Sequence, residues 1–192
     1  MKKIFVIGFN KCGTRTLHQF FKANNLRTYH VGMNYSEFTT QVETNLTEGR
    51  PILDGLGNYV VFCDMPEKVF KDFKRIDKDY PNSYFILNSR PIDKWILSRL
   101  NHGKGTYWQW LNSYLQVNRS KEEWVSFWRK DWEDHHRNVL EYFSDRSEDL
   151  LVFDIENDRP QKLKSFLNTY RLNASKWGHQ GKTKKPTFKS LK

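Results

Sequence analysis

The sequence predicts an α/β fold in which a central parallel sheet lies between layers of helices. Short apolar segments rich in β-formers alternate along the chain with longer segments whose apolar residues recur at helical spacing. The apolar segments are not cleanly alternating, which is typical of strands that are buried on both faces. With 192 residues, of which 38% are hydrophobic and 16% aromatic, the chain is long enough for one domain with a sizeable core.

The first half of the chain contributes three of the expected strands. The first apolar run ends at Gly8, and the segment after it carries apolar residues at helical spacing. Ser36 is a candidate cap for a second helix, and Pro66 stands in the first turn of a third, where a helix tolerates proline. We expect strands at residues 3–8, 28–32 and 58–64, and helices at residues 13–24, 36–48 and from 66 onward.

The second half adds two strands and a long helical region. The segment "SYFILNS" is the clearest strand, and Pro91 begins the helix that follows it. Ser120 and Glu123 have the spacing of a capping box, which marks a helix start within the helical region. Asp158 and Pro160 open a last helix. We expect strands at residues 83–89 and 149–155, and helical structure at residues 91–100, 106–143 and 158–170.

Charge and cysteine content limit the possible classes of function. The formal net charge of +10 favours anionic partners, such as nucleotides, sulfated substrates or nucleic acid, without choosing among them. Cys12 and Cys63 are the only cysteines, too few for a disulfide framework, and we expect both to be small buried thiols. No apolar run reaches the length of a membrane span, and the run before Gly8 is shorter than a signal-peptide core. We therefore expect a soluble, cytoplasmic protein.

The segment "IGFNKCGTRTL" has the composition of a phosphate-binding loop. Gly8 and Gly13 flank the loop, Lys11 lies inside it, and Thr14 and Thr16 add hydroxyl groups where the helix begins. A helix N-terminus presents unpaired N–H groups, and ligands of parallel sheets bind beyond the carboxyl ends of the strands. In the loop of a kinase or NTPase the lysine directly follows the second glycine, but Thr14 stands there. We therefore expect an anion site of a different kind.

The segment "SRPIDKWILSRL" contains a second candidate anion site. Arg90 leaves the end of the clearest strand, and Ser98 follows it by about two helical turns. A guanidinium group binds phosphate as a fork, so an arginine at a strand end beside a hydroxyl group suits a phosphate. Taken alone, the pattern also fits a surface arginine and a solvated serine.

Together the two segments resemble the donor-binding motifs of the sulfotransferases that use 3′-phosphoadenosine 5′-phosphosulfate (PAPS). "GFNKCGTRTL" resembles their 5′-phosphosulfate loop, and "SRPIDKWILS" resembles their 3′-phosphate motif. The resemblance covers residues 3–100 well and the rest of the chain in general terms. It implies a three-layer fold like that of the P-loop NTPases, with a sulfotransferase-like domain at residues 1–175 and a basic tail or nucleotide-covering loop at residues 176–192.

The resemblance also implies an activity. A sulfuryl group would move from PAPS to a hydroxyl or amine by in-line displacement, leaving adenosine 3′,5′-bisphosphate (PAP). Lys11 would steady the leaving phosphate, while Arg90 and Ser98 would hold the 3′-phosphate. No metal is implied, and the sequence has no Cys/His cluster with zinc spacing. The other donor contacts that we expect on this basis are Cys12, Gly13, Thr14, Arg15, Thr16 and, in the basic tail, Lys182.

The group that takes the proton of the acceptor is less clear. Many cytosolic relatives place a histidine after the strand between the two motifs, in a His-Leu-Pro context. Here Asp64-Met65-Pro66 stands in that place, so the sequence departs from the histidine pattern. We expect Asp64 to be the base, and the alternative is that it caps the helix after Pro66. Glu67 and His30 are weaker candidates for the base.

An aromatic region follows the second motif. Trp124, Trp128 and Trp132 recur every four residues, which predicts a core stripe along a helix. Other rings between residues 107 and 132 are candidates for an acceptor pocket, because flat rings stack on sugars, steroids or other rings. The glycine-containing segment "NHGKGTY" is a candidate acceptor loop.

We expect a nucleotide donor and a small-molecule or carbohydrate acceptor, and no membrane partner. Two alternative functions are kept: a P-loop nucleotide kinase or NTPase, and a basic nucleic-acid-binding module. Thr14 at the position of the kinase lysine counts against the first. No RRM, KH, helix-turn-helix or zinc-finger signature supports the second, so a nucleic-acid partner is not expected.

Overall fold

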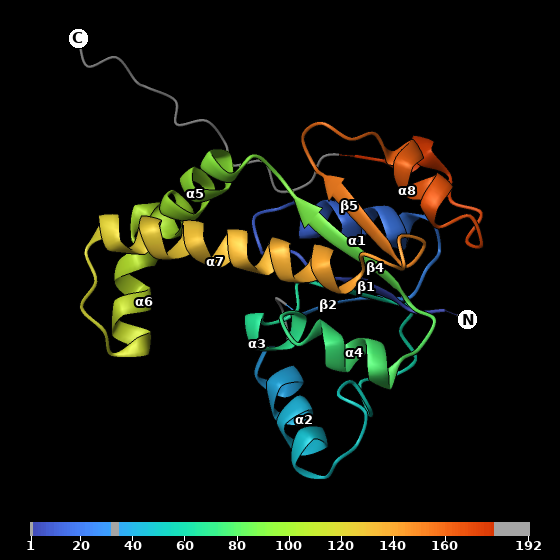
Figure 1. The fold of residues 1–192 in the computed structure, drawn as a ribbon, viewed down its shortest axis with the longest axis horizontal. Coiled ribbons are helices and arrows are strands. Elements are labelled where there is room, and N and C mark those ends of the chain that lie inside the picture. The colour runs from blue at the N-terminus through green and yellow to red at the C-terminus, as the bar shows by residue number, and fades with distance from the viewer. Residues whose placement is uncertain (1, 32–34, 179–192) are drawn as a thin grey trace.

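A computed structural model describes residues 2–31 and 35–178 of the chain (Figure 1). Five parallel strands form one sheet in the order β2-β3-β1-β4-β5. Helices flank this sheet, which confirms the expected α/β fold of the P-loop type. Strands β2 and β3 lie on one side of β1, and β4 and β5 lie on the other. The order of the strands therefore reverses direction at β1. The strands are β1 (Ile4–Val6), β2 (Thr28–His30), β3 (Val61–Cys63), β4 (Tyr84–Ser89) and β5 (Leu150–Asp154).

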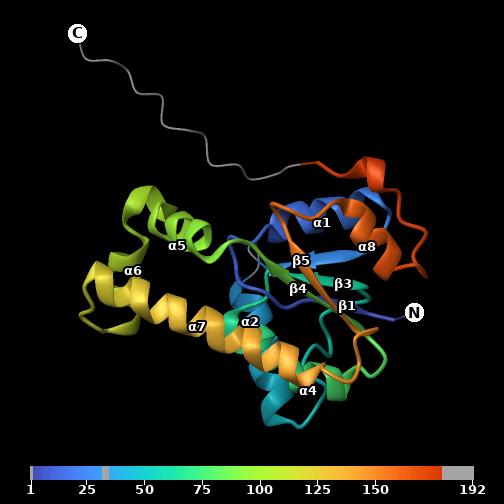
Figure 2. The same cartoon turned by 45° about the horizontal axis from the view of Figure 1, so that its top comes forward.

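Helices cover both faces of the sheet, as Figures 1 and 2 show from two directions. Helices α1 (Thr14–Ala23) and α8 (Pro160–Phe166) lie on one face, where their apolar side chains join one hydrophobic cluster. The opposite cluster includes side chains of the remaining helices. These helices are α2 (Tyr35–Thr47), α3 (Glu67–Phe70), α4 (Phe73–Asp79), α5 (Ile92–Leu100), α6 (Tyr107–Leu115) and α7 (Lys121–Tyr142).

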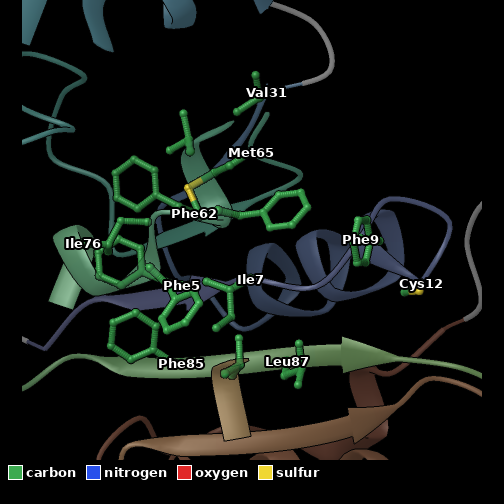
Figure 3. Packing of buried hydrophobic residues seen from close by; sticks show 14 of the residues in the cluster. Phe5, Ile7, Phe9, Cys12, Val31, Phe62, Met65, Ile76, Phe85 and Leu87 are labelled. Atoms are coloured by element: carbon green, nitrogen blue, oxygen red, sulfur yellow. The ribbon is translucent and has the colours of Figure 1, made fainter. Parts of the chain in front are cut away.

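The strands are buried on both faces. Along β1, Ile4 and Val6 belong to the cluster beneath α1 and α8, while Phe5 points into the other cluster. Figure 3 shows Phe5 between Phe62 of β3 and Phe85 of β4, and the ring centroids are 5.6 and 5.5 Å apart. This two-sided burial explains why the strand sequences are continuous apolar runs rather than alternating ones.

The helical regions are divided more finely than the sequence predicts. The helix expected after Pro66 consists of two short helices, α3 and α4, and the region at residues 106–143 consists of α6 and α7. Gln116 has a left-handed backbone (φ 54°) that ends α6. The capping box at Ser120 is confirmed: the Ser120 hydroxyl accepts from the Glu123 N–H, and the Glu123 carboxylate accepts from the Ser120 N–H. The last helix ends at Phe166 rather than near residue 170.

Other sequence-based expectations concern single residues. Trp124 and Trp128 are buried in the core, as the helical stripe predicts. Cys12 and Cys63 are both free and buried, which confirms the expected thiols, and burial raises the pKa of Cys12 to about 12. Among the described residues, no helix is long and apolar enough to cross a membrane.

The C-terminal segment packs on the sheet as far as the structure describes it. The Trp177 ring lies 5.2 Å from Phe20 of α1 and 5.7 Å from Phe153 of β5, measured between ring centroids. The Lys176 ammonium donates to the carbonyl of Ala23. Of the basic tail expected at residues 176–192, the part from residue 179 onward, which includes Lys182, lies outside the described residues.

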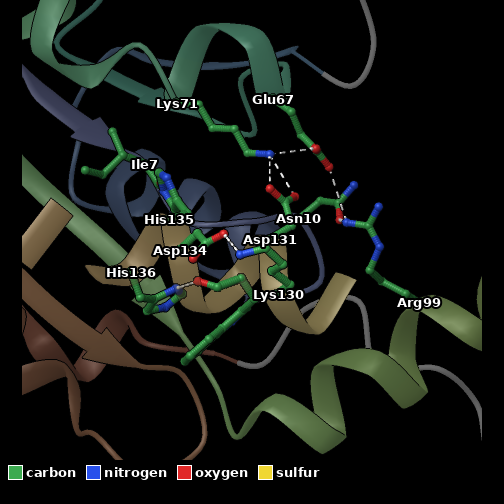
Figure 4. Close-up of polar contacts among 11 residues, drawn as sticks. Ile7, Asn10, Glu67, Lys71, Arg99, Lys130, Asp131, Asp134, His135 and His136 are labelled. Carbon is green, nitrogen blue, oxygen red and sulfur yellow. Dashed lines mark hydrogen bonds and ion pairs between the residues drawn. The ribbon is translucent and has the colours of Figure 1, made fainter. Parts of the chain in front are cut away.

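Two adjacent buried histidines connect α7 to the sheet (Figure 4). The His135 ring donates through Nε2 to the carbonyl of Ile7, at 2.7 Å. In His136, Nδ1 donates to the carbonyl of Trp132 at 2.9 Å, and Nε2 accepts from the Ser89 hydroxyl at 3.2 Å. Burial lowers the pKa of His136 and keeps the ring neutral, so a ring that donates through Nδ1 accepts at Nε2. The fold therefore depends on at least one histidine that stays uncharged.

We expect this histidine pair to make the fold sensitive to acid. Burial lowers the pKa of His136 from 6.5 to about 4, so the unfolded chain takes up this proton first. The contribution is therefore complete above about pH 6.5 and is lost as the pH falls towards about 4. The total loss from this residue is about 3 kcal/mol. Urea unfolding at a series of pH values should show a shallower acid loss in His136→Gln than in the wild type, and parallel curves would contradict the assignment.

Candidate functional site

The candidate site is built around the loop of residues 8–13, between β1 and α1. Asn88 of β4 is fully buried, and its side chain makes three hydrogen bonds to the backbone of this loop. Its side-chain oxygen accepts from the Gly8 N–H at 2.8 Å, and its amide nitrogen donates to the carbonyls of Phe9 at 3.3 Å and Cys12 at 3.0 Å. The shape of the loop is therefore set by a side chain from the neighbouring strand, which the sequence analysis did not single out.

Neither Gly8 nor Gly13 has room for a side chain. A Cβ atom on Gly8 would lie 2.0 Å from the carbonyl oxygen of Asn88. Gly13 has φ +81°, and a Cβ atom there would lie 2.3 Å from the Ile155 side chain. Lys11 has a positive φ of 65° although it is not glycine, which is uncommon for a lysine. The loop therefore keeps an unusual backbone at the residue that the resemblance assigns to the leaving phosphate.

The side chains expected at the phosphosulfate end come together. The Lys11 ammonium donates to Nδ1 of His102 at 2.8 Å, which requires a free lone pair on that nitrogen. The pKa of Lys11 is lowered by burial and by the nearby Arg15 guanidinium, while Asp64 opposes the shift. The Thr14 hydroxyl donates to the Asp64 carboxylate at 3.1 Å. The loop, the start of α1 and the residue after β3 thus meet at one edge of the sheet.

Asp64 lies directly after β3, with a left-handed backbone (φ 55°). One carboxylate oxygen accepts from Thr14, and the other lies 3.7 Å from Nε2 of His30. Burial is the main cause that lowers the pKa of His30, and Asp64 opposes it. The predicted capping role of Asp64 is wrong, because α3 begins after Pro66 without any side-chain cap. The Asp64 carboxylate turns toward the loop instead.

Arg90 reaches the same loop from the end of β4. Its guanidinium donates to the carbonyl of Lys11 at 3.0 Å and forms an ion pair with Glu156, which follows β5. Lys94 of α5 also pairs with Glu156, so one carboxylate lies between two cations. Ser98 lies one helical turn after Lys94 and hence on the same side of α5. The structure thus places a carboxylate in the predicted phosphate clamp, which sequence reasoning did not find.

Arg99 is a further cation near the loop, and its side chain is almost completely buried. It donates to the Asn10 side chain and to Glu67, at 3.3 Å in each case, as Figure 4 shows. Glu67 also pairs with Lys71, so this weaker base candidate already lies between two cations. The Trp95 indole donates to the carbonyl of Asn10 at 2.9 Å. The Arg99 guanidinium lies 4.8–5.4 Å from the ring centroids of Trp95, Tyr107 and Trp128.

A cavity of about 320 Å³ opens beside His102. Tyr107 and Trp110 stack with their planes 14° apart, and Trp110 and Tyr114 stack with their planes 10° apart. Trp110 and Tyr114 are exposed, whereas Trp124 and Trp128 of the helical stripe on α7 are buried and Trp132 is partly buried. The aromatic region therefore divides into a buried part and an exposed part. The cavity is lined by His102, Gly103, Thr106, Tyr107 and Trp110.

The remaining predicted residues have varied surroundings. The Cys12 side chain is buried in the core, so only its backbone is available for a ligand contact (Figure 3). Arg15 is exposed in the first turn of α1, and Thr16 is buried in the same turn. Within residues 2–31 and 35–178, no three histidine, cysteine, aspartate or glutamate side chains gather in a way that would hold a metal ion.

Residues 3–149 match a family of proteins described as the sulfotransferase domain. The chain belongs to this sulfotransferase domain family. The match extends from β1 to the end of α7 and includes both predicted anion-binding segments. It confirms the family that the two motifs indicate, and with it a transferase activity. No curated protein matches the chain significantly.

The role of Asn88 in this sulfotransferase domain gives a first prediction about the site. Asn88→Ala leaves one N–H and two carbonyls of the loop without their partner and should lower the free energy of unfolding by about 2–4 kcal/mol. Hydrogen exchange of the amides in residues 8–17 should also become faster.

Asn45 offers a matched control. It is likewise fully buried and donates to the carbonyls of Ile52 and Asp54, in a region distant in sequence from the loop. Asn45→Ala should destabilise the fold by a similar amount and leave the exchange of residues 8–17 unchanged. Equal exchange in the two variants would show that Asn88 does not hold the loop.

Proposed function

We propose that this sulfotransferase domain transfers a sulfuryl group from PAPS to a hydroxyl or amine of its acceptor. The observation that carries the proposal is that the Arg90 guanidinium binds the carbonyl of Lys11, in the loop before the N-terminus of α1. The Lys11 ammonium extends to His102, so the loop has one cation on each of two sides. PAPS carries its negative charge at two separate places, the 5′-phosphosulfate and the 3′-phosphate, which suits such an arrangement.

The start of α1 suits the phosphosulfate. The first N–H groups of a helix have no partner within the helix and carry partial positive charge. The first turn of α1 contains no acidic residue and includes the cation Arg15. Gly13 keeps the backbone free of a side chain at this point. In the proposal, the N–H groups of Gly13, Thr14, Arg15 and Thr16 bind the phosphosulfate together with Lys11, and Cys12 contributes only its backbone.

The cluster around Arg90 suits the 3′-phosphate. Arg90 and Lys94 already hold an anion, the carboxylate of Glu156, and a phosphate group has the same sign of charge and accepts the same hydrogen bonds. Arg90 is oriented by its bond to the loop carbonyl of Lys11. We propose that the 3′-phosphate replaces Glu156 between these cations, and that the Ser98 hydroxyl adds a further hydrogen bond.

The chemistry then follows from the positions of the charges. The acceptor oxygen or nitrogen attacks sulfur in line with the bond to the leaving 5′-phosphate oxygen. Negative charge develops on that phosphate as the bond breaks, and Lys11 with the helix N-terminus stabilises it more strongly in the transition state than in the ground state. Asp64 as the base stays a prediction, since both its oxygens have neighbours, Thr14 and His30. A cytoplasmic location is part of the same proposal.

We expect metal-free calorimetry to detect binding of PAP, the desulfated donor. Lys11→Ala and Arg90→Ala should each weaken this binding at least about tenfold, because each removes a cation from a bound phosphate. Lys130→Ala and Arg137→Ala are matched controls, since both residues pair with Asp134 on the exposed side of α7.

The same titration with ATP and Mg²⁺ tests the kinase alternative. Binding of ATP·Mg²⁺ without binding of PAP would refute the proposed donor. Binding of neither nucleotide, together with salt-dependent binding of nucleic acid, would favour the basic nucleic-acid-binding alternative.

The carboxylate in the clamp yields a separate prediction. Glu156→Gln should strengthen PAP binding about three- to tenfold, because the 3′-phosphate no longer competes with a carboxylate for Arg90 and Lys94. Asp93→Asn is the matched control: Asp93 also carries one negative charge, but it is exposed and pairs with Arg129. A weaker PAP affinity in Glu156→Gln would mean that Glu156 orients Arg90 instead of competing with the ligand.

A further inference from the structure

His102 connects the loop to the aromatic cavity. It lies in the short turn between α5 and α6, where Gly103, Lys104 and Gly105 all have positive φ. Its Nδ1 atom faces the Lys11 ammonium at 2.8 Å, and its ring lies 5.0 Å from the Tyr107 ring, centroid to centroid. It also lines the cavity of about 320 Å³. A single imidazole thus contacts the proposed donor-binding lysine and an open pocket.

The cavity has the features of a site for a ring. Its volume of about 320 Å³ lies at the lower end of the range for ligand pockets and suits one or two rings. Tyr107 and Trp110 lie nearly parallel along one helix and offer flat apolar surface, while Thr106 adds a hydroxyl group. Trp110 is 53% exposed, so its ring is accessible from solvent.

The protonation state of His102 suits a base. An ammonium group can only donate, so the contact with Lys11 leaves the lone pair of the His102 ring on Nδ1. Burial lowers the pKa of His102, and positive charges lower it further. The ring is therefore neutral at pH 7. The groups that face it are Lys11 from the loop, Arg15 from α1, Arg99 from α5 and the uncharged Tyr107 from α6.

Asp64, the other candidate for the base, does not lie on the wall of the cavity as His102 does. Its carboxylate lies against Thr14 at the start of α1 and beside His30, whereas His102 lies on the wall of the cavity. When Lys11 turns to the leaving phosphate, as in the proposed function, Nδ1 of His102 loses its present partner. That nitrogen is then free to accept a proton next to the sulfuryl group.

We propose that this cavity is the acceptor site, that it takes a hydroxyl group carried on a ring, and that His102 is the base. The inference rests on the proposed function. The O–H proton of the acceptor passes to Nδ1 as the acceptor oxygen bonds to sulfur. The bond between sulfur and the 5′-phosphate oxygen breaks with its electron pair on the phosphate. The products are a sulfate ester, PAP and an imidazolium that later releases its proton to water.

The test measures transfer from radiolabelled PAPS to two kinds of ring alcohol, p-nitrophenol and a hexose. Sulfation of the first identifies an aromatic acceptor, and sulfation of the second identifies a sugar. His102→Gln should lower kcat by about 10²- to 10⁴-fold with each acceptor that reacts, and change the affinity for PAP by less than about threefold. Trp110→Ala should raise the KM for the acceptor about tenfold and leave PAP binding unchanged. Phe127→Ala, an exposed aromatic residue on α7, is the control for Trp110.

The pH profile separates a base from a structural residue. In the wild type, kcat/KM should fall on the acid side as His102 becomes protonated, and this limb should disappear in His102→Gln. If the limb is kept in His102→Gln and lost in Asp64→Asn, then Asp64 is the base and the inference is wrong. Turnover of neither ring alcohol by an enzyme that binds PAP would overturn the acceptor assignment alone. Absence of PAP binding in the wild type would overturn the proposed function and, with it, this inference.

Discussion

The site depends on one side chain, Asn88, which joins two parallel strands at the point where both end. A carboxamide both donates and accepts, so it satisfies an N–H and two carbonyls of a loop that has no regular structure of its own. Without such a partner these buried backbone groups would each cost free energy. The loop therefore has a definite shape because the central strand pair is in register, and the register depends on the two-sided apolar packing of β1 and β4.

A second set of contacts joins the loop to helix α5. Arg99 is buried against three aromatic rings and reaches the side chain of Asn10, while the Trp95 indole holds the carbonyl of the same residue. A buried guanidinium requires compensation, which the rings, Asn10 and Glu67 supply. Three large aromatic residues thus surround the guanidinium of Arg99, so aromatic side chains contribute to the site as well as to the core.

The sequence predicts local features well, because they depend on residues close together in the chain. The loop between Gly8 and Gly13, the capping box at Ser120 and the buried strands all have local signals, and the structure contains each of them. Features that depend on distant residues were missed. Asn88 resembles any polar residue in a strand, and Glu156 resembles any surface acid, until the sheet brings them to Gly8 and Arg90. His102 lies in the segment "NHGKGTY", which the sequence indicates as a candidate acceptor loop, but its contact with Lys11 spans 91 positions of the chain.

Lys11 has contacts in two directions. Its carbonyl accepts from Arg90, and its ammonium donates to His102, so one residue with a positive φ lies between the proposed 3′-phosphate clamp and the proposed acceptor cavity. A shift of this backbone moves both contacts at once. In the proposed function, binding at the clamp would then change the affinity of the cavity for its ligand, and thermodynamic linkage makes the effect equal in both directions. Donor and acceptor in such an enzyme would bind as an energetically coupled pair rather than as independent ligands.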